Sequence, residues 1–162
     1  MSEPAAPMFH LAVSLPWYKK ARTKWLVLAG LTLVVLGIWT CSRRAYAGTK
    51  LAKQAVIHFH QQFNQKQYSE IYVGATQVFR DAAPEPDATA FFNKVHQKLG
   101  DEIRAGEPTF FANVTTGGTF ITLTYDTDFV LGKGKEKFLW KIEDGSAYLV
   151  RYDINSRDLI MK

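Results

Sequence analysis

The histidines of this 162-residue chain are the side chains best suited to proton transfer or metal binding. His58 and His60 lie two positions apart in a segment with helical periodicity. They therefore point to different faces of that helix and cannot chelate a metal as an i, i+4 pair would. His96 lies beside apolar residues of another helical segment, where a histidine is more often a hydrogen-bonded boundary residue than a base. The chain has no zinc-protease, nucleophile-elbow, phosphate-loop or dinucleotide motif. We therefore expect no enzyme, no cofactor and no metal site.

Asp126 and Asp128 are a second candidate for chemistry, because residues two apart on a strand share one face. Such a pair could act as acid and base in a concave pocket, or form an acidic patch. The neighbouring residues alternate between apolar and polar, which predicts that both carboxylates lie on a solvated face of the sheet.

Aromatic residues could line a pocket between helices and sheet. The candidate lining consists of Tyr72, Phe79, Phe92, His96, Tyr125 and Trp140. A lining of this composition could hold a small apolar ligand. The alternative, which we favour, is that these side chains fill the core against the sheet.

An uncharged apolar run from Trp25 to Cys41 determines the expected membrane topology of the rest of the chain. Its nearest charged neighbours, Lys24 and Arg43, would bracket about 27 Å of helix, close to one hydrocarbon core. The run is longer than the apolar region of a signal peptide, and aromatic residues border it on both sides. We interpret it as an uncleaved signal anchor.

Two alternatives remain for this segment. Signal peptidase could cleave after Ala45-Tyr46-Ala47, although Arg43-Arg44 fits poorly in a cleavage region. Cys41 could carry a lipid, but the preceding Ile38-Trp39-Thr40 lacks the small side chains that lipidation favours. We disfavour lipidation for that reason.

The positive charge of the chain is concentrated around the apolar run. Residues 1–50 hold seven basic side chains and one acidic one, a net +6, whereas residues 51–162 hold 13 basic and 14 acidic ones, a net −1. Such a distribution indicates contact with anionic lipid and not with nucleic acid. Four basic residues precede the run and three follow it, which favours a cytoplasmic N-terminus and a periplasmic C-terminal domain. The reverse orientation is the alternative.

The tail before the run carries apolar side chains in a period of two between Pro7 and Pro16. We expect it to dock on a partner protein or on the membrane surface. The candidate contacts are Phe9, Leu11, Val13, Leu15 and Trp17. The alternative is a weakly ordered leader.

The remaining chain reads as helices followed by strands. Apolar periodicity predicts helices at residues 51–65, 69–74 and 87–99, with Ser69 and Asp87 as N-caps. The inward residues of the third helix are expected to be Phe91, Phe92, Val95 and Leu99. Alternation predicts strands at residues 107–115, 119–131, 137–142 and 148–154. The expected turns are Gly117-Gly118, Gly132-Lys133-Gly134 and Asp144-Gly145. This order predicts an α+β fold with three helices on a curved antiparallel sheet of four strands.

Several short stretches resemble the nuclear transport factor two-like (cystatin-like) superfamily. They are Phe59-His60, Tyr68 to Tyr72, Phe79-Arg80, Val95 to Gly100, Thr116 to Leu123, Glu136 to Trp140 and Tyr152 to Ser156. Within that superfamily, residues 51–160 resemble small bacterial membrane-anchored or lipoprotein domains of unknown function. The resemblance implies a cystatin-like fold but no catalytic residue, because this fold hosts enzymes, ligand carriers and assembly modules alike. The layout of tail, span and periplasmic domain is also similar to that of assembly proteins of type IV secretion channels.

The sequence therefore predicts a cytoplasmic tail with a docking segment (1–24), a transmembrane helix (25–42), a linker or helix continuation (43–50) and a periplasmic cystatin-like domain (51–162). We expect a non-enzymatic, single-pass accessory or assembly subunit of a larger bacterial inner-membrane complex, in contact with lipid and with other subunits. The alternative is a membrane-tethered or lipoprotein domain that binds a small apolar ligand.

Overall fold

The computed structural model describes residues 30–32 and 46–161. The chain divides into two units, Met1–Trp39 and Thr40–Lys162. In the first unit the described residues 30–32 are helical and exposed. The predicted tail contacts, Cys41 and most of the predicted span lie outside the described residues. Among the helices that are described, none combines the length and the apolar character needed to cross a membrane.

The second unit begins, in its described part, with a helix at residues 46–64, here called helix 46–64. Its buried stripe includes Ala52, Val56, Phe59 and Phe63, spaced by three or four residues as one face of a helix requires. Residues 46–50, predicted as a linker or a helix continuation, are helical. The helix ends where Lys66 takes a positive φ of 59°.

Three shorter helices follow: α2 (Tyr68–Val73), α3 (Gln77–Ala82) and α4 (Glu85–Leu99). The predicted N-caps were wrong for two of them. α2 begins one residue before Ser69, and α4 begins after Pro84, so that Asp87 lies in its first turn. A proline is tolerated at a helix start because the first N–H groups have no partner in the helix.

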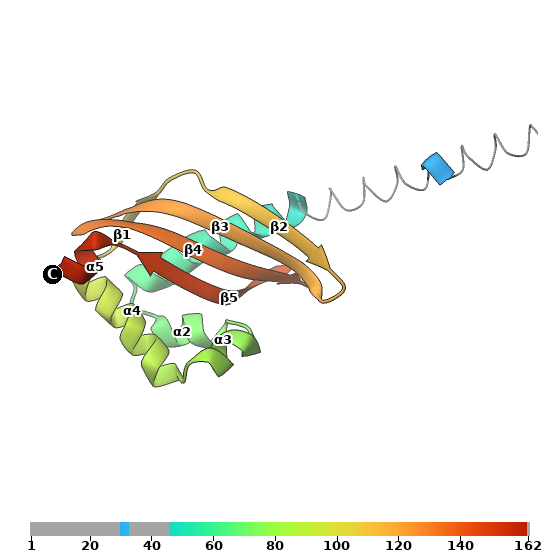
Figure 1. Ribbon diagram of the computed structural model, residues 1–162. Coiled ribbons are helices and arrows are strands. Elements are labelled where there is room, and N and C mark those ends of the chain that lie inside the picture. The colour runs from blue at the N-terminus through green and yellow to red at the C-terminus, as the bar shows by residue number, and fades with distance from the viewer. Residues whose placement is uncertain (1–29, 33–45, 162) are drawn as a thin grey trace, which may run out of the picture. The chain divides into compact units, whose positions relative to one another are not determined.

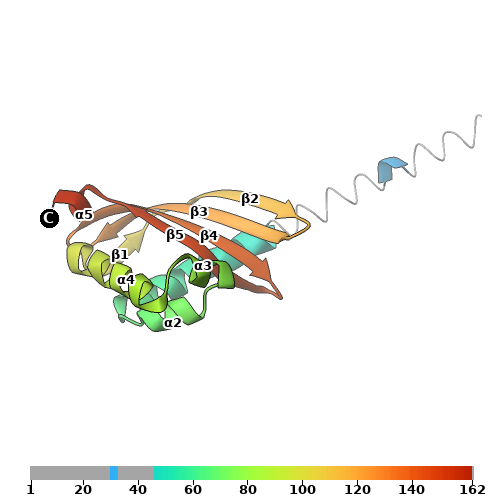
Figure 2. The ribbon, with the colours of Figure 1, turned by 60° about the horizontal axis from the view of Figure 1, so that its bottom comes forward.

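The sheet has five antiparallel strands, one more than the sequence predicted: β1 (Glu102–Ala105), β2 (Thr109–Thr115), β3 (Gly118–Phe129), β4 (Gly132–Glu143) and β5 (Ser146–Asn155). A short helix, α5 (Arg157–Met161), ends the described chain. The strand order is β1-β3-β4-β5, and β2 pairs with the other half of β3. β1 and β2 therefore share one border of a strongly curved sheet (Figures 1 and 2).

Three details of the strands differ from the predicted pattern. The turn between β2 and β3 lies at residues 116–117, so Gly118 belongs to β3 and not to the turn. The turn between β3 and β4 lies at residues 130–131, so Gly132-Lys133-Gly134 belongs to β4 and not to the turn. In β5 the pairing with β4 passes from Arg151 to Leu149 across a bulge. The extra residue reverses the alternation, so that Leu149 is buried whereas Tyr148 is 38% exposed.

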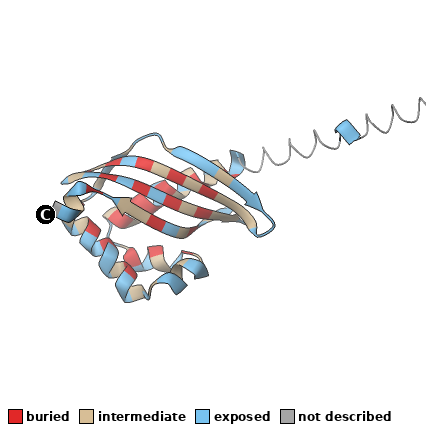
Figure 3. Ribbon diagram, in the orientation of Figure 1, coloured by how far each residue is buried: buried red, intermediate tan, exposed pale blue. Residues whose placement is uncertain are grey.

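Helix 46–64 and α2 to α4 lie on one face of the sheet, and the core fills the space between, while α5 lies at the end of the sheet near the C-terminus (Figure 2). Helix 46–64 runs beneath β3 and β4, where Gly48 approaches Ile121 and Ile142 closely. Buried and less buried residues alternate along β3, β4 and β5, as Figure 3 shows. Phe59 lies at the centre of the aromatic core, with its ring against those of Phe63, Phe92, Phe138 and Tyr152. The α+β class and the curved antiparallel sheet are thus confirmed.

Candidate functional site

A cluster of four buried polar side chains is the most concentrated chemistry in the described part of the chain. Glu136 of β4 lies at its centre with 1% of its surface exposed. Thr127 comes from β3, Tyr152 from β5 and His60 from helix 46–64. The pleat explains the placement, because Glu136 occupies the inward position between Gly134 and Phe138 on its strand.

Glu136 is the common acceptor of this cluster. The hydroxyl of Tyr152 donates to Oε1 at 2.7 Å, and the hydroxyl of Thr127 donates to Oε2 at 2.5 Å. Nε2 of His60 lies 2.9 Å from the same Oε2. An ionised carboxylate only accepts hydrogen bonds, so with Glu136 ionised this contact requires the His60 tautomer that carries a proton on Nε2. One buried acid thereby links a helix to three strands of the sheet.

Two tyrosines beside Glu136 are strongly held in the protonated form. Burial, followed by the negative charge of Glu136 and the hydrogen bond to it, raises the pKa of Tyr152 well above its usual value. Burial, with smaller contributions from Glu107 and Glu136, raises the pKa of Tyr125 to about 12. Both tyrosines therefore stay protonated near neutral pH and cannot act as a general base there.

A groove of about 520 Å³ lies beside this cluster, between helix 46–64 and the β1–β2 border of the sheet. Its lining includes His60 and Tyr125, and also Asn64 and the β1–β2 connection. Asn64 is fixed there by two hydrogen bonds to the backbone of Glu102, one of 3.0 Å and one of 2.8 Å. At the rim, Lys53 and Glu107 form an exposed ion pair of 3.2 Å.

The six residues predicted to line one pocket do not share a cavity. Tyr125 borders the groove beside His60, and Trp140 lines a different cavity. Phe79 and Phe92 line a third. The hydroxyl of Tyr72 donates to the backbone carbonyls of Arg80 and Ala83. His96 lies 2.7 Å from the Asp101 carboxylate, as expected of a hydrogen-bonded boundary residue.

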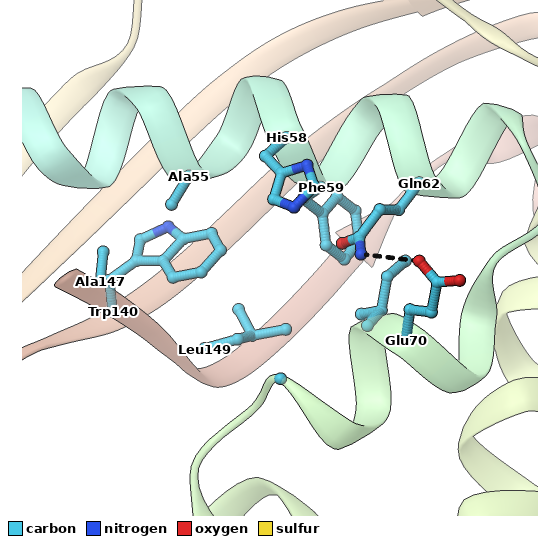
Figure 4. A pocket seen from close by; sticks show the side chains of 10 residues that line it. Ala55, His58, Phe59, Gln62, Glu70, Trp140, Ala147 and Leu149 are labelled. Carbon is cyan, nitrogen blue, oxygen red and sulfur yellow. Dashed lines mark hydrogen bonds between the residues drawn. The ribbon is translucent and has the colours of Figure 1, made fainter.

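The cavity at Trp140 has a volume of about 130 Å³ and lies between helix 46–64, α2 and the β4–β5 hairpin (Figure 4). His58 lies at its edge, and Gln62 donates a long hydrogen bond of 3.5 Å to Glu70 across it. The indole N–H of Trp140 is one of two buried side-chain polar atoms without a hydrogen-bond partner among the described residues; the other is the hydroxyl of Tyr68. His58 and His60 thus lie on different faces of their helix, as predicted.

The cavity at Phe79 and Phe92 is the most apolar of the three. It has a volume of about 210 Å³, is open to solvent on one side, and is lined by residues of α3, α4 and β5. Its lining includes Ala82, Ala88 and Phe91. Phe91, predicted to point inward, is 44% exposed at its mouth. The inner wall is the ring of Tyr152, whose hydroxyl contacts Glu136 on the far side.

Asp126 and Asp128 do not meet as an acid–base pair. Asp128 forms ion pairs with Arg104 at 2.7 Å and Lys133 at 2.8 Å, and Asp126 forms one with Lys135 at 2.8 Å. Hydrogen bonds from Lys133 and Arg104 lower the pKa of Asp128. Both carboxylates lie on the face of the sheet that the alternation predicted, away from the core.

Glu136 and Thr127 were missed by the sequence interpretation, although a signal for both exists. Each occupies an inward position of an otherwise apolar alternation: Thr127 between Tyr125 and Phe129, and Glu136 two residues before Phe138. A charged residue at such a position must find partners, because burying it alone is costly. His60, adjacent to the core residue Phe59, was the remaining clue.

Within residues 30–32 and 46–161, no group of three or more His, Cys, Asp or Glu side chains is arranged to hold a metal ion. No model of a known protein family matches the chain, and no match was found among curated proteins.

Proposed function

We propose that this chain is a non-enzymatic, single-pass accessory or assembly subunit of a larger bacterial inner-membrane complex. Its tail would be cytoplasmic, and its C-terminal domain would face the periplasm. The apolar run from Trp25 to Cys41 supports the membrane anchor, since it is long enough to span a hydrocarbon core. The domain would contribute a protein-binding surface.

The observation that carries this proposal is the apolar surface of β2. Phe110 and Phe111 are 62% and 67% exposed, and Val114 is 39% exposed. Phe110 and Val114 lie on one face of the strand and Phe111 on the other, so apolar side chains are exposed on both sides of this edge, and exposed apolar surface is typical of protein–protein interaction sites. By contrast, the polar side chains best suited to catalysis, those around Glu136, are buried and form hydrogen bonds with each other. The exposed apolar side chains of β2 favour binding of another protein. The polar groups around Glu136 already have hydrogen-bond partners, which argues against a catalytic role for them.

The family assignment is part of the same proposal. The order of the described elements, helices first and a curved antiparallel meander afterwards, supports membership of the cystatin-like superfamily. Within that superfamily we assign the chain to the small membrane-anchored or lipoprotein domains. Superposition of an experimental structure of the domain on members of the superfamily tests this assignment; a different helix–sheet arrangement would contradict it.

Extraction from native membranes tests the function. The tagged full-length chain is expressed at its natural level, extracted in mild detergent and analysed for native size and for co-purifying proteins. We expect a particle that contains other membrane proteins in a constant ratio. A particle containing only this chain would overturn the proposal.

A tail variant refines the same experiment. Deletion of residues 1–15 should remove some of the co-purifying proteins, because the apolar side chains of the tail are then lost. Replacement of residues 1–15 by a glycine–serine segment of equal length is the matched control, since it keeps the length and removes the apolar side chains. Full recovery of partners with both variants would contradict a docking tail.

A second candidate function is supported by the cavity between α3, α4 and β5. Its volume of about 210 Å³ and its lining by Phe79, Phe91 and Phe92 suit a small apolar ligand. Mass spectrometry of the purified chain under native and denaturing conditions tests this function. A bound molecule released only on unfolding would support it, and a cavity that binds no apolar probe would oppose it.

A further inference from the structure

Strand β2 is an edge strand without the features that normally prevent edges from pairing. It pairs only with β3 in the described part of the chain, and Figure 1 shows it at the border of the sheet. Its seven residues, Thr-Phe-Phe-Ala-Asn-Val-Thr, include neither a charged residue nor a proline. Its register with β3 continues without a bulge from Thr109 to Thr115. Charges, prolines and bulges are the usual protection of an edge strand.

The other border of the sheet carries such protection. β5 has a bulge at Val150 and an ion pair of 2.8 Å between Arg151 and Asp153. The backbone N–H of Thr76 and its hydroxyl both donate to the carbonyl of Leu149, so part of this edge is already occupied. Even on its own border β2 is distinct, because the neighbouring β1 carries exposed Arg104. The open, uncharged edge is therefore confined to β2.

We infer that β2 pairs with β2 of a second copy of this chain, antiparallel and about a two-fold axis at Ala112. This inference specifies one partner of the interaction function proposed above and rests on it. It extends the sheet of one copy into the sheet of the other, a recognised mode of strand addition. In an interface of two identical strands about a two-fold axis, every contact occurs twice: where residue i of one copy faces residue j of the other, residue j of the first faces residue i of the second. Each such pair must therefore be compatible.

On the inner face and at both ends, the sequence of β2 meets that requirement. About Ala112, Phe110 faces Val114 of the second copy and Thr109 faces Thr115, while on the outer face Phe111 faces Asn113. Aromatic–β-branched and threonine–threonine pairs are favourable across antiparallel strands. The inner face of the junction would join Phe110, Ala112 and Val114 of both copies, since these residues pair with Leu123, Ile121 and Thr119 of β3. Their partial exposure in the single chain would then be covered.

Charge is compatible with the same register. The nearest charged residue on this border, Glu107, is 93% exposed and would face Gly117 of the second copy. No like charges would therefore lie directly opposite each other. A foreign peptide strand would not need the match of Phe110 with Val114 and of Thr109 with Thr115 about Ala112, and this match is what favours a second copy over another partner.

Seven residue pairs make a small interface, so the dimer should be weak and should depend on concentration. Sedimentation equilibrium of the full-length chain in density-matched detergent measures it. Ala112→Lys should weaken the dimer by at least about tenfold, because two lysines would meet at the two-fold axis. Ala147→Lys is the matched control: Ala147 is also a partly buried alanine opposite an isoleucine, but in the protected edge strand β5. It should leave the dimer intact.

Mixing provides the sharpest outcome. Ala112→Lys and Ala112→Glu should each be monomeric, and an equimolar mixture should dimerise, because a lysine then faces a glutamate across the axis. Recovery on mixing also shows that neither variant is misfolded. A wild-type chain that is monomeric at all concentrations, or a dimer that Ala112→Lys leaves unchanged, would overturn the inference.

Cross-linking gives a second readout. In a Cys41→Ser background, Ala112→Cys should form an intermolecular disulfide, because directly opposed Cβ atoms lie about 4.5–5.5 Å apart. Asn113→Cys should cross-link much less, since the two introduced cysteines would be diagonal neighbours. Equal cross-linking of both variants would contradict the register. A monomeric wild type would refute the pairing and leave the proposed complex standing, whereas a dimer without other proteins would refute the proposed complex and leave the pairing standing.

Discussion

Glu136→Leu is the substitution that most directly tests how the buried polar cluster stabilises the domain. Leucine is similar in size to glutamate but accepts no hydrogen bond. The change therefore leaves His60, Thr127 and Tyr152 without their common acceptor, although all three side chains are buried. If the cluster ties helix 46–64 to the sheet, its loss should appear as a large fall in the free energy of unfolding.

The magnitude follows from the three contacts. Each buried donor left without an acceptor costs about 1–3 kcal/mol, so three of them cost about 3–9 kcal/mol in total. The loss is partly offset because a carboxylate no longer has to be desolvated, which costs several kcal/mol in a protein interior. We therefore expect a net destabilisation of about 3–5 kcal/mol, the range found when one partner of a buried charged pair is removed.

Denaturant unfolding of residues 40–162 measures this change, and Trp140, the sole tryptophan of that segment, reports it by fluorescence. The control removes the whole cluster: Glu136→Leu with His60→Leu, Thr127→Val and Tyr152→Phe. Because no polar group is then orphaned, this variant should recover to within about 1 kcal/mol of the wild type. A loss below about 1 kcal/mol for Glu136→Leu alone, or a fourfold variant less stable than the single one, would refute the reasoning.

The remaining expectations concern the tyrosines, the β1 border and the apolar cavity. Because Tyr125, with a pKa of about 12, and Tyr152 keep their protons in the fold after an unfolded tyrosine has lost its own near pH 10, the unfolding free energy should fall as the pH rises from 10 to 12. Phenylalanine at both positions should remove most of that fall, and an unchanged alkaline profile would contradict the assignment. Asn64→Ala should cost about 1–3 kcal/mol in denaturant unfolding, because it orphans the backbone of β1, whereas a neutral effect would show that this tie is dispensable. Ala82→Trp should obstruct the cavity and weaken binding of an apolar fluorescent probe by about tenfold, or 1.4 kcal/mol. Exposed Ala90 lies outside that lining, so Ala90→Trp should leave probe binding unchanged, and equal losses in the two variants would count against the cavity.

The helices and long strands follow from periodicity, because burial on one face imposes it. Phe59, Phe63, Ile121 and Leu123 occupy the core positions that their spacing predicts. β1 was missed because four residues are too few for a pattern, and its pairing depends on the far end of β3. Helix boundaries such as the start of α4 depend on which of several nearby residues acts as the N-cap. Local sequence preferences determine that choice only weakly.

The bulge in β5 shows why exact alternation cannot be extrapolated along a strand. The sequence assigns Tyr148, Val150 and Tyr152 to one face, but the register shift beside Leu139 places Leu149 and Tyr152 inward instead. Such a shift is set by pairing with a neighbouring strand and by the curvature of the sheet. Local sequence carries little information about it.

The candidate site was less accessible to prediction than the fold. Sequence alone identified aromatic residues but could not assign Tyr125, Phe92 and Trp140 to different cavities, because that depends on how the helices cross the sheet. Glu136 was predictable as an inward acid from alternation alone. Its partner His60 lies 76 positions away, and only the packing of helix 46–64 brings the two together.

The composition of the particle extracted from native membranes tests the central claim most directly. If this chain is a subunit of a larger membrane complex, native mass measurement should give one species in which the chain and other membrane proteins occur in fixed ratio. A species made only of this chain, in one or two copies, would contradict the account.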